Sequence, residues 1–132
     1  MKSETIAIDT SSEQLVDITS HVRKFCAGEG DGLVNVFLPH ATAGLAVVEV
    51  GSGTEADLPR ALERLLPRDD RYVHRHGSPG HGADHVLPAF VSPSLTLPVD
   101  DGEVALGTWQ SVVVVDTNRD NPRRTVRLSF LS

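Results

Sequence analysis

Histidines are the residues of this sequence whose types and spacing could do chemistry. Four of the six lie close together, at His74, His76, His81 and His85. His81 and His85 are four residues apart, so a helix over this segment would project both rings from one face. Such a pair could bind a metal ion, and zinc would take a third ligand from His40, His74 or Glu49. The alternative is a polar loop whose histidines bond to backbone and water.

His40 and Glu49 flank the second candidate site. Residues 34–38 and 45–48 are apolar runs that predict two adjacent strands, with a break between them. The break places His40 and Thr42 at a strand end, where their side chains can face a cleft. Glu49 closes the second run, and with His40 it could form a couple for proton transfer or metal binding. A solvated strand end is the alternative for Glu49.

Trp109 and Gln110 come just before a run of valines. An indole supplies a flat stacking surface and a glutamine amide can bond a planar heterocycle, although Trp109 could instead fill the core. Arg119, Arg123 and Arg124 follow closely. They are either a solvated charged turn or an arm that contacts phosphate in a neighbouring subunit's site.

The apolar pattern predicts mostly short strands and two helices to position these residues. Residues 5–9 and 14–18 alternate in polarity and predict an opening hairpin. A short helix is expected to end near residue 26, and a longer one over residues 54–66, where Asp57 would cap the first turn. Residues 67–83 form a long Gly- and Pro-containing loop, and loops of this length tend to be functional or disordered.

The second half of the chain predicts further strands. They are expected over residues 94–99, 103–106, 109–116 and 124–131. Residues 112–115 are four valines without alternation, so we expect them to be buried on both faces in the middle of a sheet. The predicted core draws on Val34, Val36, Leu45, Val47, Leu62, Leu65, Val113, Val115 and Leu128.

Composition excludes several classes of protein. The chain has 132 residues, enough for one domain over residues 1–132, and a net charge of −6 that argues against nucleic acid or an anionic membrane as partner. The single cysteine cannot form an internal disulfide. No apolar run is long enough to cross a bilayer, and no apolar segment resembles a secretory signal. We therefore expect a cytoplasmic protein. Walker, dinucleotide-binding and nucleophile-elbow motifs are absent.

Several short motifs resemble those of one family. They are Pro39-His-Ala-Thr-Ala-Gly-Leu45 with Glu49 and Asp57, Tyr72-x-His74, Asp84-His85, Ser92-Pro-Ser-Leu-Thr-Leu-Pro98 and Ala105-Leu-Gly-Thr-Trp-Gln110. Together they are similar to the YjbQ-like family, in the family's order and over most of the chain. The resemblance implies an α+β fold in which two largely antiparallel sheets pack as a sandwich with two short flanking helices. It also implies a homotrimer.

The resemblance further implies an activity credited to some members, that of a secondary thiamine-phosphate synthase. This enzyme joins a pyrimidine methyl diphosphate to a thiazole phosphate and releases diphosphate. Carried over by motif, the catalytic residues would be His40, Glu49 and His85. The substrate-binding residues would be Thr42, Asp57, Trp109 and Gln110. The metal candidates are His40, His74 and His85 from these motifs, together with His81 from its spacing to His85.

Two functions therefore stay open. In the enzyme, His40, His74 and His85 converge and Glu49 orients one of them. They converge either around a divalent metal, magnesium or zinc, that helps to bind the diphosphate, or around an anion such as phosphate. No Asp-Asp-x-x-Asp type of magnesium cluster lies near the histidines, which favours an incidental activity over a dedicated synthase. The alternative is a non-catalytic module that binds a small phosphorylated metabolite or a divalent metal in the same pocket.

Overall fold

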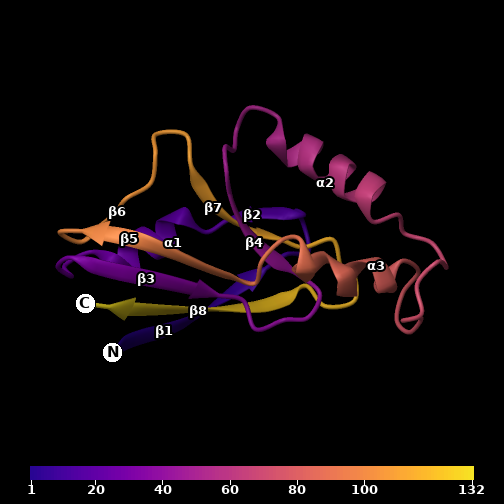
Figure 1. Ribbon diagram of the computed structural model, residues 1–132, viewed down its shortest axis with the longest axis horizontal. Helices are drawn as coiled ribbons and strands as arrows, with labels where there is room; N and C mark the ends of the chain where they lie inside the picture. Colours follow the sequence, from indigo (N-terminus) through magenta and orange to yellow (C-terminus); the bar gives the residue numbers. More distant parts are fainter.

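The computed structural model describes residues 1–132 as two antiparallel sheets and three α-helices (Figure 1). The larger sheet has the order β1 (Lys2–Asp9), β8 (Arg123–Leu131), β3 (Gly32–Phe37), β5 (Ser94–Asp100) and β6 (Glu103–Val104). The smaller sheet has the order β2 (Leu15–Asp17), β7 (Ser111–Val115) and β4 (Gly44–Val48). Every strand pair is antiparallel, which confirms the α+β class and the antiparallel sheets.

The helices are α1 (Thr19–Cys26), α2 (Thr54–Leu65) and α3 (His81–Val86), and a 3₁₀ turn over Leu87–Ala89 follows α3 directly. The first two confirm the predicted pair. The third exceeds the two helices expected, because its six residues contain glycine, aspartate and two histidines and so carry little apolar periodicity. In Figure 1, α2 and α3 lie at the same end of the molecule. No helix is both long and apolar enough to cross a membrane.

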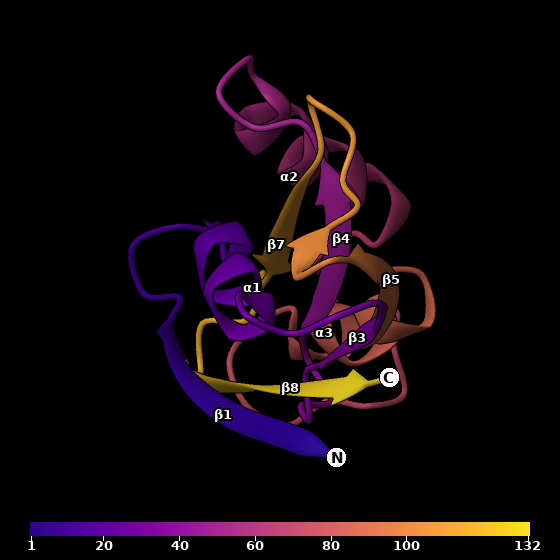
Figure 2. The same cartoon turned by 90° about the vertical axis from the view of Figure 1, so that its left-hand side faces the viewer.

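The larger sheet curls into a half-barrel, and α1 lies on its concave side (Figure 2). The main core joins both sheets, since Val34 and Val36 of β3 share one apolar cluster with Val112 and Val114 of β7. A second cluster joins the opposite face of β7 to α2 and α3.

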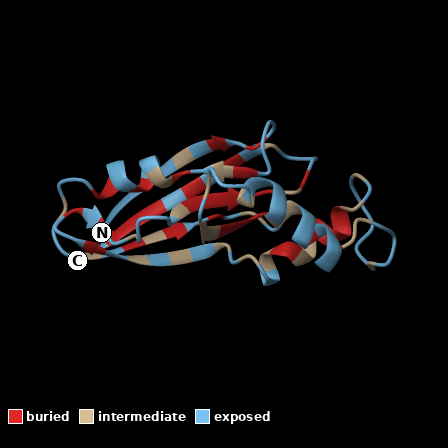
Figure 3. Ribbon diagram, turned by 90° about the horizontal axis from the view of Figure 1, so that it is seen from above, coloured by how far each residue is buried: buried red, intermediate tan, exposed pale blue.

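The valine run of β7 confirms its prediction. Val112 and Val114 point into the main core, while Val113 and Val115 point into the second, and none of the four is exposed. Figure 3 shows the buried residues concentrated on the central strands. β7 lies between β2 and β4 and has an apolar layer on each face, so none of its four valines meets solvent. The valine run therefore has no alternation of apolar and polar residues.

Two predicted strand pairings are wrong. β1 pairs with β8 and β2 pairs with β7, so the first two strands lie in different sheets and do not form a hairpin. β3 and β4 also lie in different sheets and are not adjacent strands. Alternation of polarity decides which face of a strand is buried, but it does not name the partner strand.

The predicted core is mostly confirmed. Its buried members are Val34, Val36, Leu45, Leu62, Val113, Val115 and Leu128. Val47 is only half-buried. Leu65 is 55% exposed and its assignment to the core is wrong. The reason is that α2 contributes only a narrow stripe to the second cluster, through Leu58, Leu62 and Leu66.

Candidate metal-binding site

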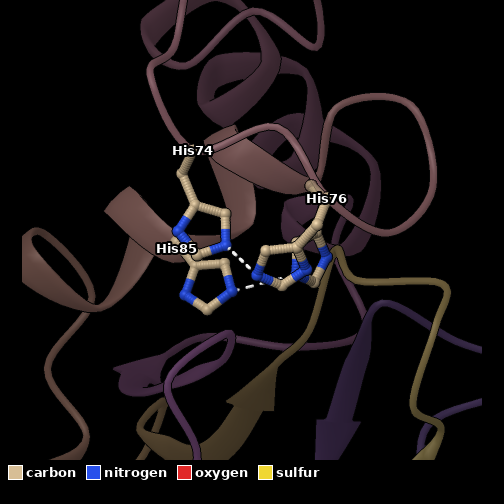
Figure 4. A group of neighbouring side chains, drawn as sticks. His74, His76 and His85 are labelled. Atoms are coloured by element: carbon tan, nitrogen blue, oxygen red, sulfur yellow. Dashed lines mark hydrogen bonds between the residues drawn. The ribbon is translucent and has the colours of Figure 1, made fainter.

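Four histidines converge where the loop after α2 meets α3 (Figure 4). The ligand nitrogens of His74, His76, His81 and His85 all lie within 4.8 Å of one another. Nε2 of His81 and Nε2 of His85 are 2.9 Å apart, and Nε2 of His74 contacts Nε2 of His76. The His74 ring stacks on the His85 ring with centroids 3.9 Å apart. We call these residues the four-histidine cluster.

The helix spacing of His81 and His85 and the small size of Gly82 bring the rings of the cluster together. The spacing of His81 and His85 in α3 puts both rings on one helix face, as the sequence suggested. Gly82 lets the preceding loop lie directly against α3, because a Cβ at this residue would stand 2.6 Å from Cβ of Tyr72 and 2.7 Å from the His74 carbonyl oxygen. Only a glycine therefore allows His74 to approach the helix so closely.

Asp84 anchors α3 from its other side. The carboxylate is fully buried and accepts hydrogen bonds from Thr117 Oγ1 at 2.8 Å and Arg68 Nη2 at 3.2 Å, and Arg68 Nη1 also contacts it. Arg68 lies in the loop after α2, and Thr117 in the connection from β7 to β8. Asp84 is thus committed to holding α3 in place and is not part of the four-histidine cluster.

Asp120 orients His81. Its Oδ2 lies 2.9 Å from Nδ1 of His81, and the Ser78 backbone N–H donates to the same oxygen at 3.1 Å. A carboxylate only accepts hydrogen bonds, so the contact places a proton on Nδ1 and leaves the lone pair of Nε2 facing the cluster. The bond from Ser78 is the main cause that lowers the pKa of Asp120. Asn118 Nδ2, which can only donate, also lies 3.2 Å from Nδ1, but the contact with the charged carboxylate is shorter and stronger, so the carboxylate decides where the proton lies.

The environment favours neutral imidazoles. Burial, followed by the neighbouring His74, His81 and His76, lowers the pKa of His85. Burial and the neighbouring His76 and His81 likewise lower the pKa of His74. A lowered pKa favours the neutral imidazole, which is the form that ligates a metal.

A polar hollow of about 220 Å³ opens beside the cluster. Its walls include His74, His76 and His81 together with Asp69, Asp70 and Arg75, and no hydrophobic side chain lines it. A ligand on the cluster thus has room on the solvent side.

Comparison with known proteins places the chain in a family. The family model described as UPF0047 protein YjbQ-like matches residues 4–132. The chain belongs to the YjbQ-like family. UPF0047 protein Rv2556c of Mycobacterium tuberculosis is 60% identical over 131 residues, which cover 99% of this chain and 98% of the relative.

Solved structures agree with this assignment. The hypothetical protein APE1520 from Aeropyrum pernix K1 is 28% identical and superposes with a TM-score of 0.90, covering 100% of this chain and 99% of that chain. The conserved hypothetical protein TT1486 from Thermus thermophilus is 33% identical, with a TM-score of 0.83, and covers 97% of this chain and 99% of that chain. Neither protein is named for an activity.

The structure places two other residues of the YjbQ-like motif apart from the cluster. Nε2 of His40 accepts the backbone N–H of Thr125 on β8 at 2.9 Å. Glu49 is exposed at the end of β4, and its carboxylate makes no hydrogen bond or ion pair. Of the residues expected to converge, His74 and His85 meet, while His40 and Glu49 are not in the group.

The remaining substrate candidates of the YjbQ-like motifs lie elsewhere too. Trp109 and Gln110 lie in the connection from β6 to β7, at the end of the molecule away from α3 (Figure 1). Trp109 is 73% exposed and does not fill the core, and Gln110 Oε1 accepts the Gly107 N–H at 2.8 Å. Asp57 is exposed in the first turn of α2, where no side chain caps the helix.

Arg124 has neither of the two roles predicted for the arginine turn, a solvated charge or a phosphate contact. Its Nε and Nη2 donate to Asp116 at 2.7 and 3.0 Å, and Nη2 also donates to Thr42 at 2.9 Å. Arg124 is 2% exposed, so it is a buried structural residue rather than a solvated or phosphate-binding one. Thr42 is buried in the same network, and only Arg119 and Arg123 are exposed.

Sequence reasoning missed two parts of the site. His76 belongs to the histidine-rich loop but is not among the predicted ligands, although its spacing from His74 could have indicated one. Asp120 is not predicted at all, because its approach to His81 depends on how the β7 to β8 connection folds against the loop. No local pattern signals such a contact.

Proposed function

We propose that this protein binds a divalent transition metal ion, zinc by ligand type, at the four-histidine cluster. The observation that carries the proposal is the contact between Asp120 and His81, which leaves Nε2 of His81 as a lone pair directed at three other imidazoles. A carboxylate that fixes the tautomer of a ligating histidine is the usual outer layer of a zinc site. Imidazole suits zinc far better than magnesium, which prefers oxygen ligands.

The dimensions support zinc. Tetrahedral zinc with Zn–N distances of about 2.0–2.1 Å separates its ligand nitrogens by roughly 3.3–3.4 Å. The cluster spans separations up to 4.8 Å, and the pair in α3 stands at 2.9 Å, so small ring rotations would bring the nitrogens to that spacing. The residues present thus fit the ion.

Zinc titration by calorimetry tests the proposal on protein made without a histidine tag and treated with chelator. We expect saturation at one ion per chain, and replacement of one ligand by His85→Ala to weaken binding by more than about tenfold. His21→Ala is the matched control, because His21 is exposed on α1 outside the cluster. Equal affinity in the His85 variant would refute the site.

The polar hollow supports a second part of the proposal, a small phosphorylated metabolite bound at the metal. Arg75 and the ion would supply positive charge, offset by Asp70, since Asp69 is already paired with Arg71. The hollow's volume of about 220 Å³ admits a phosphate group and a small body.

Thiamine-phosphate synthase activity is the second candidate function, favoured by membership of the YjbQ-like family and by the hollow beside the cluster. In this proposal the cluster and Arg75 hold the diphosphate while the thiazole nitrogen attacks the pyrimidine methyl carbon. The connection from β6 to β7, which contains Trp109 and Gln110, lies away from α3 in Figure 1, so their contact with a heterocycle bound at the cluster would need a neighbouring subunit.

Thiamine-phosphate formation by the pure protein, beside Arg75→Gln and His85→Ala, tests this second candidate. Loss of turnover in both variants supports the enzyme. Turnover in the variants equal to that of the wild type would refute the enzyme and leave the non-catalytic binding module as the only candidate.

We further propose a homotrimer. Leu33 and Phe37 on β3 and Leu131 on β8 are 45%, 39% and 47% exposed. Leu33 and Leu131 are register partners, so apolar side chains are neighbours on the outer face of the larger sheet. Burial against another copy would remove them from water.

A further inference from the structure

A separate cavity of about 130 Å³ lies between α2 and α3. No histidine of the four-histidine cluster lines it. Its apolar wall is formed by Leu62 and Leu66 of the α2 segment and by Ala83 and Leu87 of the α3 segment. These side chains are at most 9% exposed, so the wall belongs to the second core cluster.

Charged side chains line the rest of this cavity. Arg68 is already neutralised by Asp84. Arg60 and Arg119 also line the cavity, and neither makes a hydrogen bond or ion pair through its guanidinium group. Glu63 is the one further charged residue there, so the two arginines leave the lining with an uncompensated charge of +1.

Arg60 and Arg119 are exposed, so their guanidinium groups are free to meet a ligand from solvent beside the apolar wall. Arginine stays charged at any physiological pH, and its planar fork matches a carboxylate through two parallel hydrogen bonds. A net charge of +1 complements a monoanion better than a phosphate dianion. A cavity of about 150 Å³ holds benzene, and this one is slightly smaller at about 130 Å³, so it has room for a body of at most about six non-hydrogen atoms, with the carboxylate outside that body beside the exposed Arg60 and Arg119.

We propose that this cavity binds a small organic carboxylate, with its apolar body against Leu62, Leu66 and Leu87 and its carboxylate between Arg60 and Arg119. The proposal does not depend on metal binding. The cavity and the polar hollow share no lining residue.

Benzoate is the probe, titrated into the chelator-treated, full-length protein and followed by amide chemical shifts. Removing metal prevents benzoate from binding through the cluster. We expect shifts centred on Leu66, Ala83 and Leu87. Benzyl alcohol has the same ring without the charge, and phenyl phosphate has the ring with a dianion. Each should bind about tenfold more weakly than benzoate, since hydrogen bonds to matched charges are the strong ones.

Substitutions assign the binding to the two arginines. Arg60→Gln and Arg119→Gln should each weaken benzoate binding by about tenfold, since each removes one charged donor. Arg64→Gln is the matched control, because Arg64 is exposed on the same helix but does not line the cavity. The proposal is overturned if benzoate shifts amides elsewhere, if the double variant binds it as well as the wild type, or if phenyl phosphate binds more tightly.

Discussion

At the scale of single residues, the proton on His81 decides what the cluster can bind. Asp120 accepts from Nδ1 and so presents Nε2 as a metal ligand. We predict that Asp120→Asn weakens zinc binding by about 10–100-fold, because an amide can accept from or donate to the ring and no longer selects one tautomer. Calorimetry measures the change.

Asp57→Asn makes the same chemical change at an exposed residue of α2 that is not in the cluster. It should bind zinc like the wild type. An Asp120 variant with unaltered affinity would contradict the role given to this carboxylate.

The lowered pKa values of the histidines predict a pH dependence of stability. Burial is the largest cause that lowers the pKa of His40, His74 and His85 below 6.5. At a pH below 6.5 but above the lowered pKa values, these histidines are protonated in the unfolded chain and still neutral in the folded one. The free energy of unfolding therefore decreases as the pH falls from 6.5 towards the lowered pKa values of the folded protein. Above 6.5 these groups contribute no pH dependence.

Urea denaturation of the metal-free protein at about pH 7.5 and about pH 5.5 measures this difference, since the two values bracket the ordinary histidine pKa. His85→Gln should reduce the loss at the lower pH, whereas His21→Gln should not. Acidic groups with lowered pKa values, such as Asp120, act in the same direction but at lower pH.

At the scale of elements, the approach of the loop to α3 depends on Gly82. Alanine usually favours a helix over glycine by about 1 kcal/mol. Here its Cβ would collide with Tyr72 and the His74 carbonyl. We predict that Gly82→Ala destabilises the fold by about 1–3 kcal/mol and displaces His74, which weakens zinc binding as well.

Gly30→Ala is the control, since a Cβ at this residue meets nothing within 4 Å and its φ is not positive. Thermal unfolding and zinc titration of both variants separate the two effects. A Gly82 variant as stable as the wild type would show that the loop can move away without cost.

How far the sequence predicts an element depends on what its pattern encodes. The valine run of β7 encodes burial on both faces, and the structure confirms it. The alternation in β1 and β2 encodes which face is buried but not the partner, so the predicted hairpin is wrong. Helix α3 carries ligands rather than an apolar stripe, so only the spacing of His81 and His85 pointed to it.

The candidate site was predictable to the same extent. The spacing of His81 and His85 predicts that these two rings lie together, whereas His74 is only one of three candidates that the sequence offers as a third ligand. Asp120 reaches His81 from another part of the chain through tertiary folding, which no local pattern describes.

At the scale of the whole molecule, the outer face of the larger sheet predicts self-association. Leu33, Phe37 and Leu131 are exposed there on neighbouring strands. We expect light scattering at micromolar concentration to give the mass of a trimer. Phe37→Asp would place a charge in the apolar contact, where its desolvation is unfavourable, and should shift the protein towards the monomer.

Val73→Asp is the matched control for this substitution. Val73 is 99% exposed, but it lies in the loop before the cluster rather than on the sheet. A general loss of solubility or folding would affect both variants, whereas a specific contact between sheets is lost only in the Phe37 variant. A wild-type monomer would refute the trimer and, with it, any contribution of Trp109 to a neighbour's site. The metal site would stand, because one chain supplies all four of its histidines.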